Sequence, residues 1–160
     1  MAIQTIYYSA LVGHIVGLTL MAGTTVSDYI VFRQFWKQVP IDRSKGIVIQ
    51  RAVSRFPLLF GIGFIFLVIS GVTMMAITHG VFGEQIWFRI KFALIIIIII
   101  NGLAFGRRQG VKLKRYLSEE LPGINGEQNL LRIKRNLGLF HLLQIALFIL
   151  IYVLSVFKFN

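Results

Sequence analysis

The chain of 160 residues contains no cysteine. Disulfide bonds, thiolate-ligated iron–sulfur clusters and covalent c-type haem attachment are therefore excluded. Acidic residues are also rare, with 6 Asp and Glu against 17 Lys and Arg. Charged residues make up 14% of the sequence and hydrophobic residues 56%, whereas a soluble domain is about 25% charged and about 45–50% apolar. The composition predicts an integral membrane protein with a single domain.

The net charge of +11 raises the question of a nucleic-acid partner. Most of the basic residues lie in two groups, at positions 33–55 and 107–135, and each group separates two apolar segments. Basic loops of this kind are typical of the cytoplasmic side of membrane proteins, where they face anionic lipid. We therefore expect contact with the lipid bilayer and no nucleic-acid partner.

Four apolar segments are long enough to cross a bilayer, which takes about 20 helical residues. They lie at positions 6–32, 56–78, 86–105 and 137–157. The sequence predicts an all-α fold, an integral membrane four-helix bundle with up-down-up-down topology. The basic loops 33–55 and 106–136 are predicted to be cytoplasmic, which leaves both termini outside a cell (inner) membrane.

The longer loop, 106–136, has some structure of its own. Residues 110–120 have the composition of a helix, and residues 121–126 have the glycine and proline content of a turn. We expect a short amphipathic helix on the membrane surface, followed by a turn.

His14 lies well inside the first apolar segment, with Gly13 and Gly17 beside it. Ionisable groups are costly to place inside a bilayer, so each of them is a candidate functional residue. Small neighbours leave room beside the imidazole either for a flat cofactor or for close contact with another helix. The residues themselves leave both interpretations of His14 open.

Three further polar positions lie inside the predicted helices. Asp28 is near the cytoplasmic end of its helix, where we expect an ion pair with Arg33 or Arg55. Asn101 is expected to form a hydrogen bond between helices. His141 lies on a polar stripe of the last helix, which either joins helices or binds a ligand. The stripe consists of His141, Gln144, Tyr152 and Ser155.

Another group of ionisable residues lies where the second helix ends and the third begins. His79, Arg89 and Lys91 are all predicted to be on the outer side, where basic residues break the usual charge bias. Imidazole can supply an axial bond to haem iron, while arginine and lysine can pair with the propionates. We therefore expect a haem b site with His14 on the iron and an unidentified second axial ligand. The candidate cofactor-binding residues are His14, His79, Arg89, Lys91 and His141.

Several short motifs carry a resemblance to a known family. They are His14 followed by Ala22-Gly23, Trp87-x-x-x-Lys91-x-x-Leu94 at the start of the third helix, Arg135-Asn136 before the last helix and Lys158 after it. In order and layout these motifs resemble the four-helix membrane family of HemJ-type protoporphyrinogen oxidases and the related CopD-like proteins. The resemblance implies that haem b is bound and that His14 and Lys91 are the catalytic pair.

Three functions are compatible with these features. The first is a haem b-binding membrane oxidoreductase or electron-transfer protein that acts on a porphyrinogen or a quinone. The second is a non-enzymatic subunit that packs in a homo-oligomer or a larger membrane complex, with its glycines at helix contacts. Those glycines are Gly13, Gly17, Gly61, Gly63 and Gly71. The third is a small transporter component with an ion or proton path through His14, Asp28 and His141.

Overall fold

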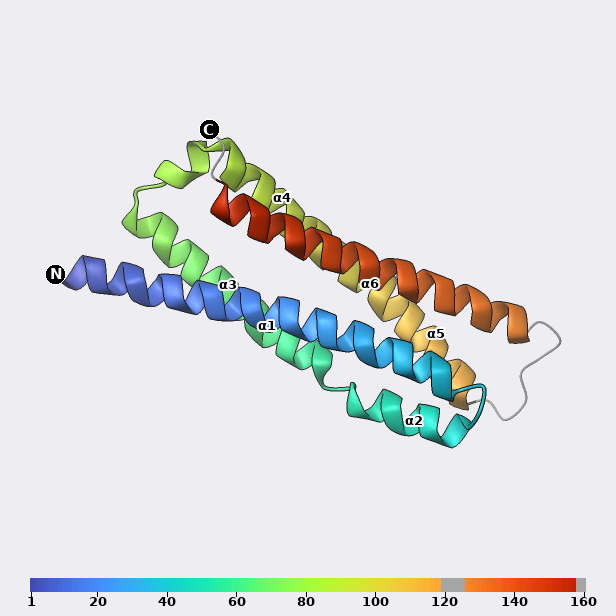
Figure 1. Cartoon of the computed structure of the whole chain (residues 1–160). Helices are drawn as coiled ribbons and strands as arrows, with labels where there is room; N and C mark the ends of the chain where they lie inside the picture. Colours follow the sequence, from blue (N-terminus) through green and yellow to red (C-terminus); the bar gives the residue numbers. More distant parts are fainter. Residues whose placement is uncertain (119–125, 158–160) are drawn as a thin grey trace.

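The computed structural model describes residues 1–118 and 126–157, and within these ranges it contains helices and no strand. In chain order they are α1 (Ala2–Gln38), α2 (Arg43–Ala52), α3 (Phe56–Ile77), η1 (Val81–Glu84), α4 (Ile86–Ile100), η2 (Asn101–Gly106), α5 (Arg107–Ser118) and α6 (Gly126–Val156). The four long helical stretches run antiparallel in succession, and the start of α1 and the end of α6 lie at the same end of the bundle (Figure 1).

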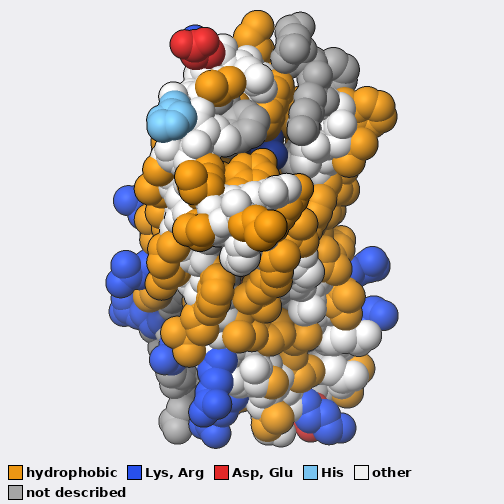
Figure 2. Space-filling model, turned by 90° about the vertical axis from the view of Figure 1, so that its left-hand side faces the viewer, with side chains coloured by type: hydrophobic (Ala, Val, Ile, Leu, Met, Phe, Trp, Pro, Cys, Tyr) orange, Lys and Arg blue, Asp and Glu red, His pale blue; other side chains and the backbone are white. Residues whose placement is uncertain are grey.

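Four of the helical stretches are long and apolar enough to cross a membrane. They are Ala2–Gln38, Arg43–Ile77, Ile86–Leu117 and Gln128–Val156. The fold class predicted from the sequence, an all-α four-helix membrane bundle, is therefore confirmed. Figure 2 shows hydrophobic side chains over most of one face, with Lys and Arg side chains toward its lower part and its sides. The assignment of the basic end to the cytoplasm stays a prediction.

The helices extend beyond the apolar segments that predicted them. α1 continues to Gln38, and its 37 residues span about 56 Å, well beyond a hydrocarbon core of about 30 Å. α5 is not a separate surface helix. It continues α4 through η2, a short π-helix, so that 86–117 forms one helical stretch. Hydrophobicity marks the part of a helix that lies in lipid, but a helix ends only where its backbone pattern is broken.

The loop predicted at 33–55 contains the helix α2. Its N-cap is Asp42, whose carboxylate accepts hydrogen bonds from the amides of Ser44 and Lys45 at 2.9 and 3.4 Å. The hydroxyl of Ser44 donates a further bond to the same oxygen, at 2.6 Å. These hydrogen bonds lower the pKa of Asp42 because they favour the charged carboxylate. The bond from the Ser44 hydroxyl makes the largest contribution. The turn predicted at 121–126 lies almost entirely outside the described residues.

Two hydrophobic clusters hold the helices together. The first lies in the middle of the bundle and draws on α1, α3, α4 and α6: Leu18, Met21, Leu67, Leu94, Ile98, Leu147, Phe148, Ile151 and Leu154. The second lies at the basic end, where the extended parts of α1 and α6 meet α5: Phe35, Trp36, Leu113, Leu117, Ile133 and Leu137. The second cluster explains why these helices remain ordered past the apolar segments, since each buries one apolar face there.

The closest helix contact joins α1 and α3 through Gly17 and Gly63. A Cβ on Gly17 would lie 2.7 Å from the carbonyl oxygen of Gly63, and a Cβ on Gly63 would lie 2.8 Å from that of Gly17. Two glycines therefore let the backbones touch, as is common between membrane helices. Gly61 has open space around it, so it is not a contact position of this kind.

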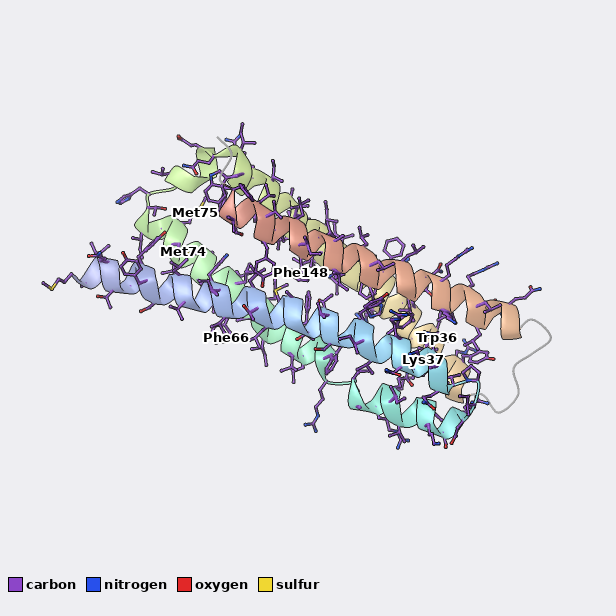
Figure 3. The ribbon with its side chains drawn as sticks, viewed as in Figure 1. Trp36, Lys37, Phe66, Met74, Met75 and Phe148 are labelled. Carbon is purple, nitrogen blue, oxygen red and sulfur yellow. The ribbon has the colours of Figure 1, made fainter. Side chains whose placement is uncertain are left out.

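Burial is uneven along this helix pair. In α1 the first fully buried residue is Gly17, and in α3 the last is Ser70. The N-terminal part of α1 and the last turns of α3 are thus more open than the middle of the bundle. Met74 and Met75 lie in these last turns, whereas Phe148 of α6 lies nearer the middle of the bundle (Figure 3).

Candidate functional site

His14 is held by a hydrogen bond across the α1–α3 contact. Its Nδ1 lies 3.0 Å from the hydroxyl oxygen of Ser70. Ser70 itself is buried, and its hydroxyl lies 2.6 Å from the carbonyl oxygen of Phe66 one turn earlier. The imidazole is adjacent to Gly71, where a Cβ would be 3.6 Å from Cε1 of His14. Helix contact and hydrogen bond together fix the position of the ring.

These distances identify the tautomer of His14. A hydroxyl has a single proton, and the short contact to the Phe66 carbonyl requires that proton because a carbonyl can only accept. The oxygen of Ser70 then accepts from His14, so Nδ1 carries the hydrogen. In a neutral imidazole the lone pair is consequently on Nε2.

Lys91 belongs to the same region. It is half-buried on the first turns of α4, and its ammonium lies 5.4 Å from the ring centroid of Trp87, one turn away. The charge of Lys91 also interacts electrostatically with His14. The two residues that the resemblance pairs, on the first and third spans, are thus within electrostatic range of each other.

His79 and Arg89 are placed differently. His79 is exposed just after α3 and has a positive φ of 52°, a backbone conformation uncommon for residues other than glycine. Arg89 is also exposed, and its Nε donates a hydrogen bond to the carbonyl of Gly83 at 3.0 Å. Arg89 therefore fastens the α3–α4 connection. Since His79 is nine residues beyond Ser70, it lies roughly 13 Å further along than the His14 contact.

His141 forms a second site with Asp28. Its Nδ1 lies 2.7 Å from the carbonyl oxygen of Leu137, and its Nε2 lies 3.1 Å from a carboxylate oxygen of Asp28. The imidazole is buried and stacks on Phe32, with ring centroids 4.8 Å apart. Both ring nitrogens are occupied, so binding of a cofactor by His141 would require one of these bonds to break.

The expected ion pair of Asp28 with Arg33 or Arg55 is wrong, since the carboxylate pairs with His141. Arg33 lies five positions further along α1, which turns it about 140° around the helix from Asp28. Nδ1 of His141 must carry a hydrogen because its partner is a carbonyl. A hydrogen-bonded imidazole–carboxylate pair is less costly inside a membrane than a single isolated charge.

The two histidine sites are far apart along the bundle. Asp28, the partner of His141, is 14 residues from His14 on the same helix, a separation of roughly 21 Å. His14 and His141 therefore cannot bind one iron from opposite sides. Among the described residues there is no group of three or more His, Cys, Asp and Glu side chains placed to hold a metal ion.

A buried amide pair lies beside the Asp28–His141 site. Asn101, at the start of the π-helix η2, donates from Nδ2 to Oε1 of Gln144 at 2.7 Å. Gln144 in turn donates to the carbonyl of Ile98 at 3.3 Å. The predicted role of Asn101, a hydrogen bond between helices, is confirmed. The inner part of the polar stripe on the last helix faces the interior, since His141 and Gln144 are both buried.

Sequence reasoning did not identify Ser70 as part of the site. A serine is common in membrane helices, where its hydroxyl usually bonds to its own backbone, as this one does to Phe66. The available signal was its position directly before Gly71, at a depth that matches His14. Only the register of α1 against α3 shows which polar residue meets the imidazole.

Comparison with protein-family models gives no match, and comparisons with curated proteins and with solved structures give no match either.

Proposed function

We propose that this protein is a multi-pass membrane oxidoreductase or electron-transfer protein that binds haem b through His14. The observation that carries the proposal is the hydrogen bond from Nδ1–H of His14 to Ser70. Metal-ligating histidines almost always donate their second ring N–H to an oxygen, which orients the ring and makes the ligating nitrogen more basic. Ser70 supplies that oxygen, and Nε2 has the lone pair for an axial bond.

The surrounding residues suit the same ligand. Gly71 presents no side chain to Cε1 of the imidazole, so the face of the ring remains accessible. Lys91 supplies a cation within electrostatic range of His14, and an ammonium group pairs well with a carboxylate such as a propionate. When bound, haem would supply the redox chemistry, and the helices would set its potential and exclude water.

The proposal leaves the second axial ligand unidentified. His141 pairs with Asp28, which is roughly 21 Å from His14 along α1, so His141 does not share an iron with His14. An axial position without a protein ligand would be available to a substrate or a small exogenous ligand. We propose a quinone or a porphyrinogen as the substrate, because largely apolar ring molecules can reach the open ends of α1 and α3 from the lipid.

An absorption spectrum of the detergent-purified protein, expressed with ample haem, tests this function. We expect a Soret band that His14→Ala removes and that His79→Ala, the matched control, leaves in place. Ser70→Ala should weaken haem retention about 10- to 100-fold, the usual effect of losing the oxygen that orients a metal-binding histidine. Carbon monoxide should shift the spectrum of the reduced protein if an axial position is open. A colourless wild-type protein would refute the proposal.

A second function is supported by the exposed surface of the spans. In the apolar part of each span, between 17% and 39% of residues are buried within the chain, so a large apolar area faces outward. A non-enzymatic subunit of a homo-oligomer or larger membrane complex would cover part of that area. A colourless protein that nevertheless has a defined oligomeric mass in native mass spectrometry would favour this second function.

A further inference from the structure

A pocket of about 320 Å³ lies at the basic end of the bundle, outside the regions of His14 and His141. It is formed where the end of α1 meets α5 and the first turns of α6, and Trp36 and Lys37 mark this end of α1 in Figure 3. The residues that line it are Trp36, Val39, Pro40, Arg43, Tyr116, Leu117, Leu130, Leu131 and Lys134. This described lining contains two cations and no acidic side chain.

Trp36 has an unused hydrogen-bond donor in this pocket. Its side chain is 8% exposed, and its Nε1 is buried without a partner among the described residues. Buried polar groups in proteins are nearly always paired, so an unpaired donor on a residue that lines a pocket points to a ligand that can accept a hydrogen bond. An indole can donate but cannot accept, which restricts the ligand to an acceptor such as an oxygen.

Two basic residues give the pocket its charge. The ammonium of Lys134 lies 5.7 Å from the ring centroid of Trp36, so this cation and the indole donor are close together. Arg43 donates from one Nη2 to the carbonyl oxygens of Tyr116 and Leu117, at 3.0 and 3.1 Å. Those bonds hold the guanidinium at the end of α5, in the wall of the pocket. The Lys134 ammonium and the indole donor of Trp36 together favour an anion with acceptor oxygens.

The position along the bundle identifies the source of that anion. Trp36 is four residues beyond the first apolar segment, which ends at position 32, a distance of roughly 6 Å along α1. The pocket thus lies just beyond the apolar part of the bundle, at its basic end. Its wall also contains Leu117, Leu130 and Leu131, which suit an acyl chain. We propose that this pocket binds the phosphate headgroup of an anionic phospholipid.

Native mass spectrometry of the full-length protein in detergent tests the proposal, with phosphatidylglycerol and phosphatidylcholine of the same acyl chains as probes. Trp36→Phe keeps the ring but removes the N–H, and should weaken phosphatidylglycerol binding about three- to tenfold. Lys134→Gln should weaken it about fivefold. The matched control is Arg132→Gln, which removes an equal charge from an exposed position on the same helix outside the pocket. It should change binding less than twofold.

Two results would overturn the proposal. Equal losses from Lys134→Gln and Arg132→Gln would mean that the lipid responds to general surface charge, and not to this pocket. Displacement of phosphatidylglycerol by inorganic phosphate at similar concentration, again dependent on Trp36, would identify free phosphate as the ligand. If Trp36→Phe is poorly folded by circular dichroism, the comparison of Lys134→Gln with Arg132→Gln decides alone. The outcome is independent of whether haem is bound.

Discussion

Replacing Gly17 with alanine should separate α1 from α3, and the expected effect can be worked out from the structure. The new Cβ would lie 2.7 Å from the carbonyl oxygen of Gly63 and 2.8 Å from the amide nitrogen of Leu67. Both are backbone atoms, so neither can rotate away as a side chain would. To reach an ordinary contact the helices must move apart by about 0.7 Å, which also weakens the neighbouring dispersion contacts.

Forced overpacking of this kind costs about 1–3 kcal/mol, and the better helix propensity of alanine returns at most about 1 kcal/mol. We therefore expect Gly17→Ala to destabilise the protein. The matched control is Gly23→Ala on the same helix, where a Cβ would meet nothing within 4 Å. That substitution should be neutral or stabilising by up to about 1 kcal/mol. The contrast depends on position alone, because both substitutions make the same chemical change.

The measurement is the free energy of unfolding in mild detergent, by titration with sodium dodecyl sulfate and circular dichroism. Gly17 is three residues from His14, whose contact with Ser70 is 3.0 Å. A displacement of about 0.7 Å would take that contact beyond the range of a good hydrogen bond. Gly17→Ala should consequently also lower haem retention if His14 binds iron. Equal stability of the Gly17→Ala and Gly23→Ala proteins would refute the close packing of α1 on α3.

Three further predictions follow from other parts of the molecule. Asn101→Leu and Gln144→Leu should each lower the free energy of unfolding by about 1–3 kcal/mol, because each leaves a buried partner unsatisfied. The double variant should lose less than the sum of the two single losses. Additive losses in the same unfolding assay would contradict the hydrogen bond between the two side chains. The lowered pKa of Asp42 means that its support for α2 is complete above the ordinary value of 3.8 and is lost as the pH falls through the lower folded value. Amide hydrogen exchange in α2 should follow this loss, and Asp42→Asn should remove the dependence. For topology, single cysteines at Gly83 and Gly110 should react with an impermeant maleimide from the outside and the inside respectively, and the reverse pattern would invert the predicted orientation.

The membrane-spanning part of the fold could be predicted from the sequence because a bilayer imposes a simple rule. About 20 consecutive apolar residues must form a helix, since lipid offers no partner for an unpaired backbone group. The residues at which the helices end could not be predicted as well. Residues such as Phe35, Trp36 and Leu113 lie among many charges, and their burial became apparent only when α1, α5 and α6 were seen to pack together.

The candidate sites could also be predicted from the sequence only in part. His14 and Lys91 could be selected from the sequence because a charge or imidazole in an apolar helix is costly, and in the structure the two interact electrostatically. The pairing of Asp28 with His141 could not be selected, since these residues are 113 positions apart. Which polar groups meet depends on the rotation and the register of two helices, and local sequence does not specify either.

The sequence by itself determined that the chain crosses a membrane four times and that a few ionisable groups are placed in an apolar environment. The tertiary structure decided what each group contacts: Ser70 for His14, Asp28 for His141 and a pocket of about 320 Å³ for Trp36. It also decided that Gly17 is a point of backbone contact while Gly23 is not. The physical reason is that burial in lipid depends on composition, which is local, whereas a hydrogen bond or a close contact requires two helices to match to within a fraction of an ångström.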